Sequence, residues 1–79
     1  MPEVRVTFDR VLNDDARRRI RRALEELPCP QEHAPALQQV VEASGSDMTI
    51  DVCCHDVCSA AQAAMIKAAR GAGYAGEAG

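Results

Sequence analysis

Cysteine and histidine, the residue types best suited to hold a metal ion, fall in two short stretches of this chain. Residues 29–33 read Cys-Pro-Gln-Glu-His, and residues 53–58 read Cys-Cys-His-Asp-Val-Cys. The two stretches contain all four cysteines and both histidines. Thiolate and imidazole are the ligands that borderline and soft cations such as Zn(II) and Cu(I) prefer. The sequence therefore predicts a zinc or copper site if the fold brings the two stretches together.

The spacing of the thiols ranks the candidate ligands. Cys54 and Cys58 are four residues apart across an expected helix start, so they can share one face and form the best pair. Alternation along the preceding strand predicts that Cys53 points to the opposite side from Cys54. A tetrahedral Cys₃His or Cys₂His₂ set would be completed from the remaining candidates. The full set of candidate metal ligands is Cys54, Cys58, Cys29, His55, His33 and Cys53.

The same cysteines are also compatible with roles other than metal binding. Cysteine often packs as a small, inert hydrophobic residue, and thiols close together also do redox chemistry. Cys54 or Cys58 beside His55 would resemble a nucleophile with its base. However, neither a substrate pocket nor an oxyanion donor can be read from the residues, so we predict that the protein is not an enzyme. For Asp56 we expect two roles: capping the second helix and orienting a ligating imidazole.

Length and composition predict one small domain over residues 1–79. A core of this size rarely supplies more than about 3–5 kcal/mol without a metal, disulfides or a partner. Phe8 and Tyr74 are the only aromatic residues, which makes stabilisation by an ion or by oligomerisation more valuable here. The net charge of −3 gives no general case for nucleic-acid binding.

The chain shows no apolar run of the roughly 18 residues that a membrane span needs, and its first residues do not form a secretory signal. We therefore expect a cytoplasmic protein without membrane association. Thiols are kept reduced in that compartment, which favours metal binding or redox chemistry over structural disulfides.

The first half of the chain predicts a strand followed by a helix. Val4, Val6 and Phe8 alternate with polar residues, which indicates a strand with one buried face. Asn13 supplies a capping side chain, and Pro28 ends the helix that follows. Its apolar residues fall on one face: Ala16, Ile20, Ala23, Leu24 and Leu27.

The second half repeats this order. Met48, Ile50 and Val52 alternate as in a strand, and Gly71 and Gly73 end the helix after it. The apolar residues of that helix occupy the same offsets as in the first: Val57, Ala61, Ala64, Met65 and Ala68. The tail, residues 74–78, is compatible with a short edge strand.

Residues 36–43 between the two halves fit either a strand or a helix. Leu37, Val40 and Val41 match helical spacing slightly better. A strand would give the third strand a neighbour, and residues 44–47, Ser-Gly-Ser-Asp, suit the hairpin turn. We favour the strand for that reason.

The resulting order predicts an α+β fold, a ferredoxin-like βαββαβ sandwich with an antiparallel sheet and two helices on one face. With this order the chain resembles the heavy-metal-associated domain family, small carriers of copper and zinc. The resemblance lies in the first strand (residues 4–8), the first helix with its proline (20–28) and the end of the second helix with its glycine-tyrosine turn (66–74). The family's Cys-x-x-Cys ligands have no counterpart, since residues 10–15 contain no cysteine.

The predicted topology itself suggests where a site would lie. The first helix runs down and ends at Cys29, and the third strand runs down and ends at Cys53 and Cys54. These segments would meet at the end of the domain opposite the family's ion site. We therefore expect carriage, buffering or sensing of an ion by a thiol cluster at that end.

A row of arginines on the first helix offers a second surface. Acidic residues in the same helix nearly cancel its charge, so it is either a solvated face or a docking surface for an acidic protein partner. In the second case the chain would be a metal-free interaction or oligomerisation domain. The arginines are Arg17, Arg18, Arg19, Arg21 and Arg22.

Overall fold

The structure is a computed structural model that describes residues 2–29, 31, 36–42 and 45–78. Within these residues the chain forms two helices and four strands, with a short 3₁₀ turn, η1, before the second helix. In order these are β1 (Glu3–Phe8), α1 (Asp14–Glu25), β2 (Leu37–Glu42), β3 (Asp47–Val52), η1 (His55–Val57), α2 (Cys58–Gly71) and β4 (Gly76–Ala78).

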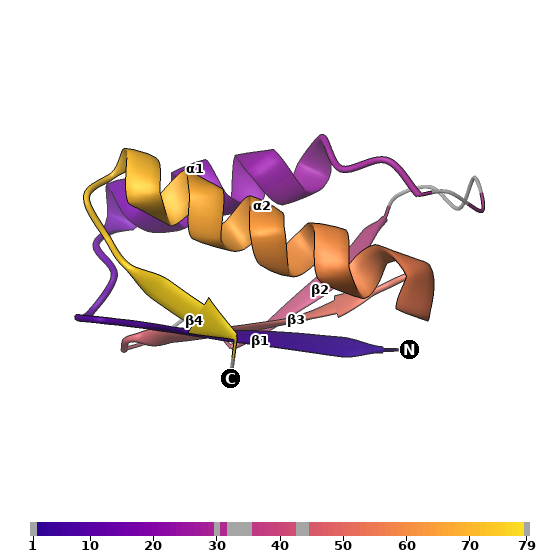
Figure 1. Cartoon of the computed structure of the whole chain (residues 1–79), viewed down its shortest axis with the longest axis horizontal. Helices are drawn as coiled ribbons and strands as arrows, with labels where there is room; N and C mark the ends of the chain where they lie inside the picture. The colour runs from indigo at the N-terminus through magenta and orange to yellow at the C-terminus, as the bar shows by residue number, and fades with distance from the viewer. Residues whose placement is uncertain (1, 30, 32–35, 43–44, 79) are drawn as a thin grey trace.

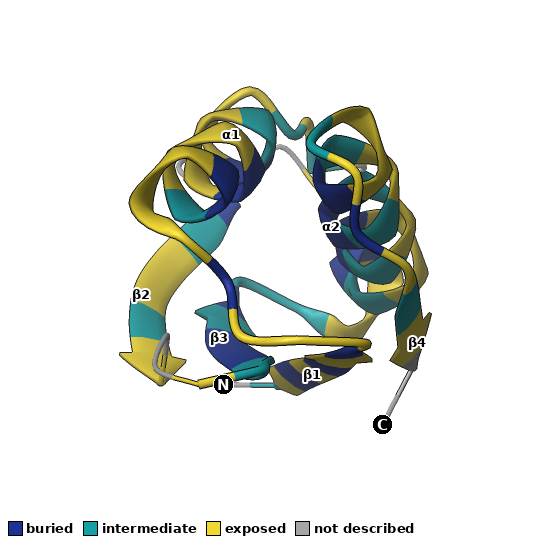
Figure 2. Cartoon of the chain, turned by 90° about the vertical axis from the view of Figure 1, so that its left-hand side faces the viewer, coloured by how far each residue is buried: buried dark blue, intermediate teal, exposed yellow. Residues whose placement is uncertain are grey.

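The four strands form one antiparallel sheet in the order β2-β3-β1-β4. Both helices cover the same face of this sheet and lie side by side (Figures 1 and 2). The fold class is therefore α+β, as predicted, and β4 is the edge strand expected from the tail. Among the described residues, neither helix has the length and apolarity that crossing a bilayer requires.

Alternation in β1 and β3 builds the floor of the core. Val4 and Val6 of β1 are buried, and their neighbours Glu3 and Arg5 face solvent. In β3, the residues Met48, Ile50 and Val52 are buried against the helices. Because side chains alternate between the faces of a strand, this pattern turns one face of the sheet to the helices and leaves the other open.

The first helix begins where its capping residues predict. Asn13 Oδ1 accepts a hydrogen bond from Ala16 N at 2.8 Å, and Asp14 and Asp15 occupy the first turn, where the helix dipole favours acidic groups. Ile20 and Leu24 are fully buried one turn apart. The predicted first helix is confirmed.

The second helix begins later than the sequence indicates. Residues 55–57 form η1, and no side chain caps either η1 or α2, so the expectation that Asp56 caps the helix is wrong. The buried row is Ala61, Met65 and Ala69, which displaces the inner face from Ala68 to Ala69.

Residues 37–42 form the strand that we favoured, and the pairing of β2 with β3 explains the ambiguity in the sequence. The register shifts twice, between Leu37 and Gln39 and between Val40 and Glu42. Each irregularity breaks the two-residue alternation, so Leu37 and Val40 lie three residues apart yet are both half-buried. Residue 43 of the expected strand and residue 44 of the expected turn lie outside the described residues. Gly45, with φ at 67°, adopts the left-handed conformation that suits glycine.

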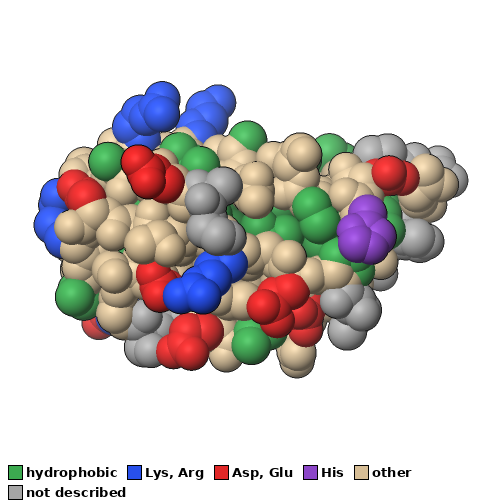
Figure 3. All heavy atoms as spheres, turned by 60° about the horizontal axis from the view of Figure 1, so that its bottom comes forward, with side chains coloured by type: hydrophobic (Ala, Val, Ile, Leu, Met, Phe, Trp, Pro, Cys, Tyr) green, Lys and Arg blue, Asp and Glu red, His purple; other side chains and the backbone are tan. Residues whose placement is uncertain are grey.

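Acidic side chains predominate among the charged groups on the open face of the sheet, with basic surface between them in one place (Figure 3). Arg5 bonds Asp47 at 2.8 Å, and Gln39 donates to Asp51 at 2.7 Å. An exposed ion pair such as Arg5–Asp47 contributes little stability. The core between sheet and helices therefore carries the fold.

Truncating the helix side of this core should destabilise the domain strongly. We expect Ile20→Ala to lower the free energy of unfolding by about 2–5 kcal/mol, because Ile20 is fully buried. Val11→Ala is the matched control and should change it by less than about 0.5 kcal/mol, since Val11 is 67 % exposed. Urea unfolding followed by circular dichroism measures both. Equal losses in the two variants would contradict the assigned core.

Candidate metal centre

Two hydrogen bonds hold the segment after α1 against the junction that follows β3. The Cys53 N–H donates to the carbonyl of Ala36 at 2.9 Å, which extends the contact between β2 and β3 by one residue. Gln31 Nε2 donates to Asp56 Oδ2 at 2.9 Å. These contacts bring the two cysteine stretches to one end of the domain, where the predicted topology places them.

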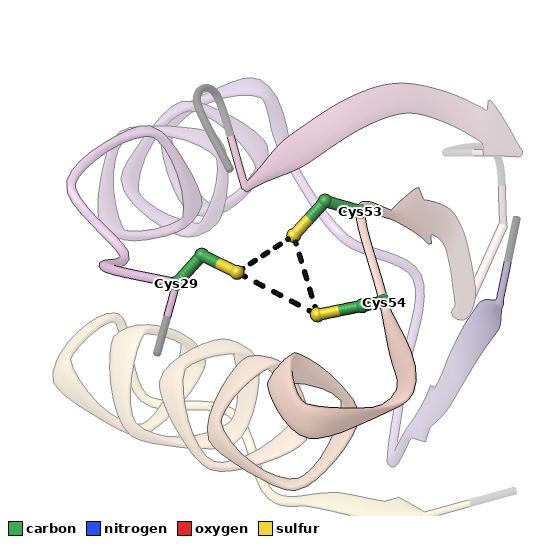
Figure 4. A group of neighbouring side chains, drawn as sticks. All are labelled: Cys29, Cys53 and Cys54. Carbon is green, nitrogen blue, oxygen red and sulfur yellow. Dashed lines mark hydrogen bonds between the residues drawn. The ribbon is translucent and has the colours of Figure 1, made fainter. Parts of the chain in front are cut away.

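Three thiols meet at this end. The sulfur of Cys29 lies 3.2 Å from that of Cys53 and 3.5 Å from that of Cys54, and the Cys53 and Cys54 sulfurs are 3.7 Å apart. Figure 4 shows the three side chains pointing toward one another, one from the loop after α1 and two from the junction before α2. We call Cys29, Cys53 and Cys54 the thiol triangle. Its ligand atoms are close enough to share one metal ion.

The thiol triangle is half-buried and fully reduced. All three cysteines pack against the hydrophobic core, and none forms a disulfide. Within it the Cys53 thiol is harder to ionise than an ordinary thiol. The pKa of Cys53 is raised from 9.0 to about 12. The main cause is removal of the thiol from water, and hydrogen bonds to Cys29 and Cys54 add to it. In the ion-free protein Cys53 is therefore a neutral thiol, and a metal ion would displace its proton.

Cys53 and Cys54 were expected on opposite sides, and the structure corrects this. Regular β3 ends at Val52, and the chain bends at residues 53 and 54. Alternation holds only while a strand continues. Once the chain leaves the sheet, two consecutive side chains reach the same space.

Cys58, expected as the best partner of Cys54, is not part of the thiol triangle. The i, i+4 argument requires helical backbone between the two residues. Cys54 instead has extended geometry, with φ at −161° and ψ at 167°, and η1 separates it from the helix. Cys58 is half-buried at the first position of α2 and packs against the core.

The structure separates the remaining candidates. His55 is exposed at the start of η1 and lies outside the group of mutually close ligand atoms. His33 lies outside the described residues. Asp56, expected to orient an imidazole, accepts a hydrogen bond from Gln31 instead. Sequence reasoning missed Gln31 because a lone glutamine in a loop carries no signal of its partner.

The opposite end of the domain is closed by contacts of Arg10 and Tyr74. The Arg10 guanidinium stacks on the Tyr74 ring, 4.2 Å from its centroid, and donates to the carbonyl of Gly73 at 2.9 Å. The Tyr74 hydroxyl accepts from Asn13 N at 3.1 Å. These contacts fasten the loop before α1 to the chain after α2.

The arginine row of α1 is largely engaged in local ion pairs. Arg17 pairs with Asp14, Arg19 with Asp15 and Arg21 with Glu25. Their partners lie three or four residues away on the same helix, which is the spacing of side chains that neighbour one another on a helix surface. The two remaining arginines of the row are Arg18 and Arg22. They line an open groove between the helices, together with Lys67 of α2.

The fold and the site together define a small α+β protein with a group of three thiols suited in spacing to a metal ion. Comparisons of the chain with protein-family models, with curated proteins and with solved structures found no match.

The raised pKa of Cys53 predicts a loss of stability in alkaline solution. The unfolded chain ionises this thiol from pH 9.0 upward, whereas the folded state keeps it protonated up to about pH 12. The contribution of the Cys53 thiol to the free energy of unfolding is therefore present below pH 9.0 and is lost as the pH rises from there toward about 12. Urea unfolding of the reduced, ion-free protein from about pH 8 to about pH 10 measures the loss.

Cys53→Ser is the matched variant for this measurement, because its hydroxyl does not ionise in that range. We expect the free energy of unfolding of the variant to fall less with pH than that of the natural chain. Parallel pH profiles of the two proteins would contradict the assignment.

Proposed function

We propose that this chain is a small metal-binding protein that holds Zn(II) or Cu(I) through the thiol triangle and serves carriage, buffering or sensing of the ion. The observation that carries the proposal is the convergence of Cys29, Cys53 and Cys54, whose sulfurs lie 3.2–3.7 Å apart. Three sulfurs reach a common point only because segments far apart in the sequence are held together. Thiolates are the ligands that both ions favour.

We infer the ferredoxin-like arrangement as the scaffold of this function. The order β-α-β-β-α-β, the strand order β2-β3-β1-β4 and the two helices on one face support it. Kinship with heavy-metal-associated domains belongs to the same proposal and rests on the sequence resemblance in residues 4–8, 20–28 and 66–74. In this chain the ion would sit at the opposite end of the sheet, between the loop after α1 and the junction before α2.

The position of the thiol triangle suits an ion that is bound and later released. Its three ligands come from two loops at one end of the domain, and they are half-buried rather than sealed in the core. Zinc bound by three protein ligands keeps a position open for a further ligand, through which exchange can begin. We therefore propose a binding role rather than catalysis, in the cytoplasm, where thiols stay reduced.

Serine substitutions test which thiols bind. We expect the reduced chain to take up one Zn(II) or one Cu(I), and Cys29→Ser, Cys53→Ser and Cys54→Ser each to weaken binding by about a hundredfold or more, because each removes one of three linked ligands. Native mass spectrometry gives the stoichiometry, and competition with a chromophoric chelator gives the affinity.

Cys58→Ser is the internal control, since it removes a half-buried cysteine outside the thiol triangle. It should bind the ion as the natural chain does. A natural chain that takes up neither ion with all thiols reduced would refute the proposal. Loss of binding in Cys58→Ser, with binding unchanged in the other three variants, would show that the ion is not held by the thiol triangle.

The hydrogen bond between Gln31 and Asp56 predicts a positioning role for Gln31. Gln31→Ala removes the donor that fastens the segment carrying Cys29 to η1, and we expect metal affinity to fall by about tenfold. The control is Gln39→Ala, which removes a similar glutamine-aspartate bond, to Asp51, between β2 and β3. The same chelator competition measures both affinities, and equal effects in the two variants would argue against this role.

A further inference from the structure

The dimensions of the thiol triangle restrict the geometry of an ion that binds it without rearrangement. At a metal–sulfur distance of about 2.3 Å, a tetrahedral ion separates its sulfur ligands by about 3.8 Å and a planar three-coordinate ion by about 4.0 Å. All three edges are shorter, at 3.2, 3.5 and 3.7 Å. They correspond to sulfur–ion–sulfur angles between about 88° and 107° at that bond length.

Two of these angles, about 88° and about 99° at that bond length, lie well below the tetrahedral value. Such angles are characteristic of a trivalent ion with a lone pair, such as As(III) or Sb(III). Such an ion forms three bonds to sulfur on one side, and its lone pair occupies the other. It therefore uses three thiolates and needs no fourth protein ligand. Among the described cysteine, histidine, aspartate and glutamate residues, the group of mutually close ligand atoms consists of these three thiols.

Charge balance favours the same class of ion. Three thiolates around a trivalent ion form a neutral centre, whereas with Zn(II) they leave one net negative charge and with Cu(I) two. The three cysteines are half-buried and pack against the aliphatic core. An uncompensated charge is costly in such surroundings, and a neutral complex avoids that cost.

We propose that the thiol triangle is a binding site for a pyramidal, thiol-seeking trivalent ion of the arsenite class. The inference rests on the proposed function, because it uses the same three thiols and names the ion that they fit best. The reaction is a condensation. Arsenous acid carries three hydroxyl groups, and each Cys thiol replaces one of them. Three S–H and three As–O bonds break, three As–S bonds and three water molecules form, and arsenic stays trivalent.

The test is titration of the reduced chain with sodium arsenite in the presence of a zinc chelator. We expect one arsenic atom per chain by native mass spectrometry, a mass gain of one arsenic minus three hydrogens, and protection of three of the four thiols from a thiol reagent. X-ray absorption should show three sulfur neighbours and no nitrogen or oxygen. In a competition without chelator, arsenite should displace Zn(II).

Single-site variants make the assignment specific. Cys29→Ser, Cys53→Ser and Cys54→Ser should each weaken arsenite binding by about a hundredfold or more, since two thiols cannot complete the pyramid. Cys58→Ser should bind as the natural chain does and protect three of its three thiols. Circular dichroism of each variant establishes that it is folded before binding is compared.

The outcomes separate this inference from the function on which it rests. If Zn(II) or Cu(I) binds through the three thiols but arsenite protects fewer than three, the inference is refuted and the metal-binding function stands. Binding of arsenite with a nitrogen or oxygen neighbour, or with equal affinity in Cys54→Ser, also overturns it. If no ion binds at all, the proposed function fails as well.

Discussion

The end of β3 is the constraint on which the rest of this structure depends. β3 is an inner strand, paired with β1 on one side and β2 on the other, and its regular pairing stops at Val52. The chain then bends, and the Cys53 N–H donates to the carbonyl of Ala36, the residue before β2. Because β2 follows α1 in the chain, this bond ties the segment after α1 to the junction before α2. A strand that continued through both Cys53 and Cys54 would keep its alternation and send the two neighbouring thiols to opposite faces.

Folding energetics and binding chemistry are coupled at this end of the domain. The core is built largely of aliphatic residues between one face of the sheet and two helices, and the three cysteines extend it at one end. Uptake of an ion there would join two segments some twenty-five residues apart in the sequence. A ligand that binds only the folded state stabilises it by mass action, which matters in a domain this small. At the other end of the domain, the contact between Arg10 and Tyr74 joins two segments far apart in the sequence without an ion.

Most of the secondary structure could be predicted from residue patterns, and the exceptions have physical causes. The alternation of β1 and the cap at Asn13 are local, so the sequence alone reveals them. β2 was ambiguous because its register shifts against β3 disturb the alternation. The start of α2 was misplaced because Asp56 meets Gln31, a residue twenty-five positions away, and does not cap the helix.

The sequence by itself determined which residue types were present for metal chemistry and, through its strand and helix periods, that two cysteine stretches would approach one another. Only the tertiary structure decided which sulfurs meet. Local spacing favoured Cys54 with Cys58, yet the structure assembles Cys54 with Cys53 and Cys29. The reason is that the direction of a side chain where one element gives way to the next depends on backbone angles, and these are set by long-range pairing. The bond from Cys53 to Ala36 and the bend after Val52 are such long-range effects, and residue spacing contains no information about them.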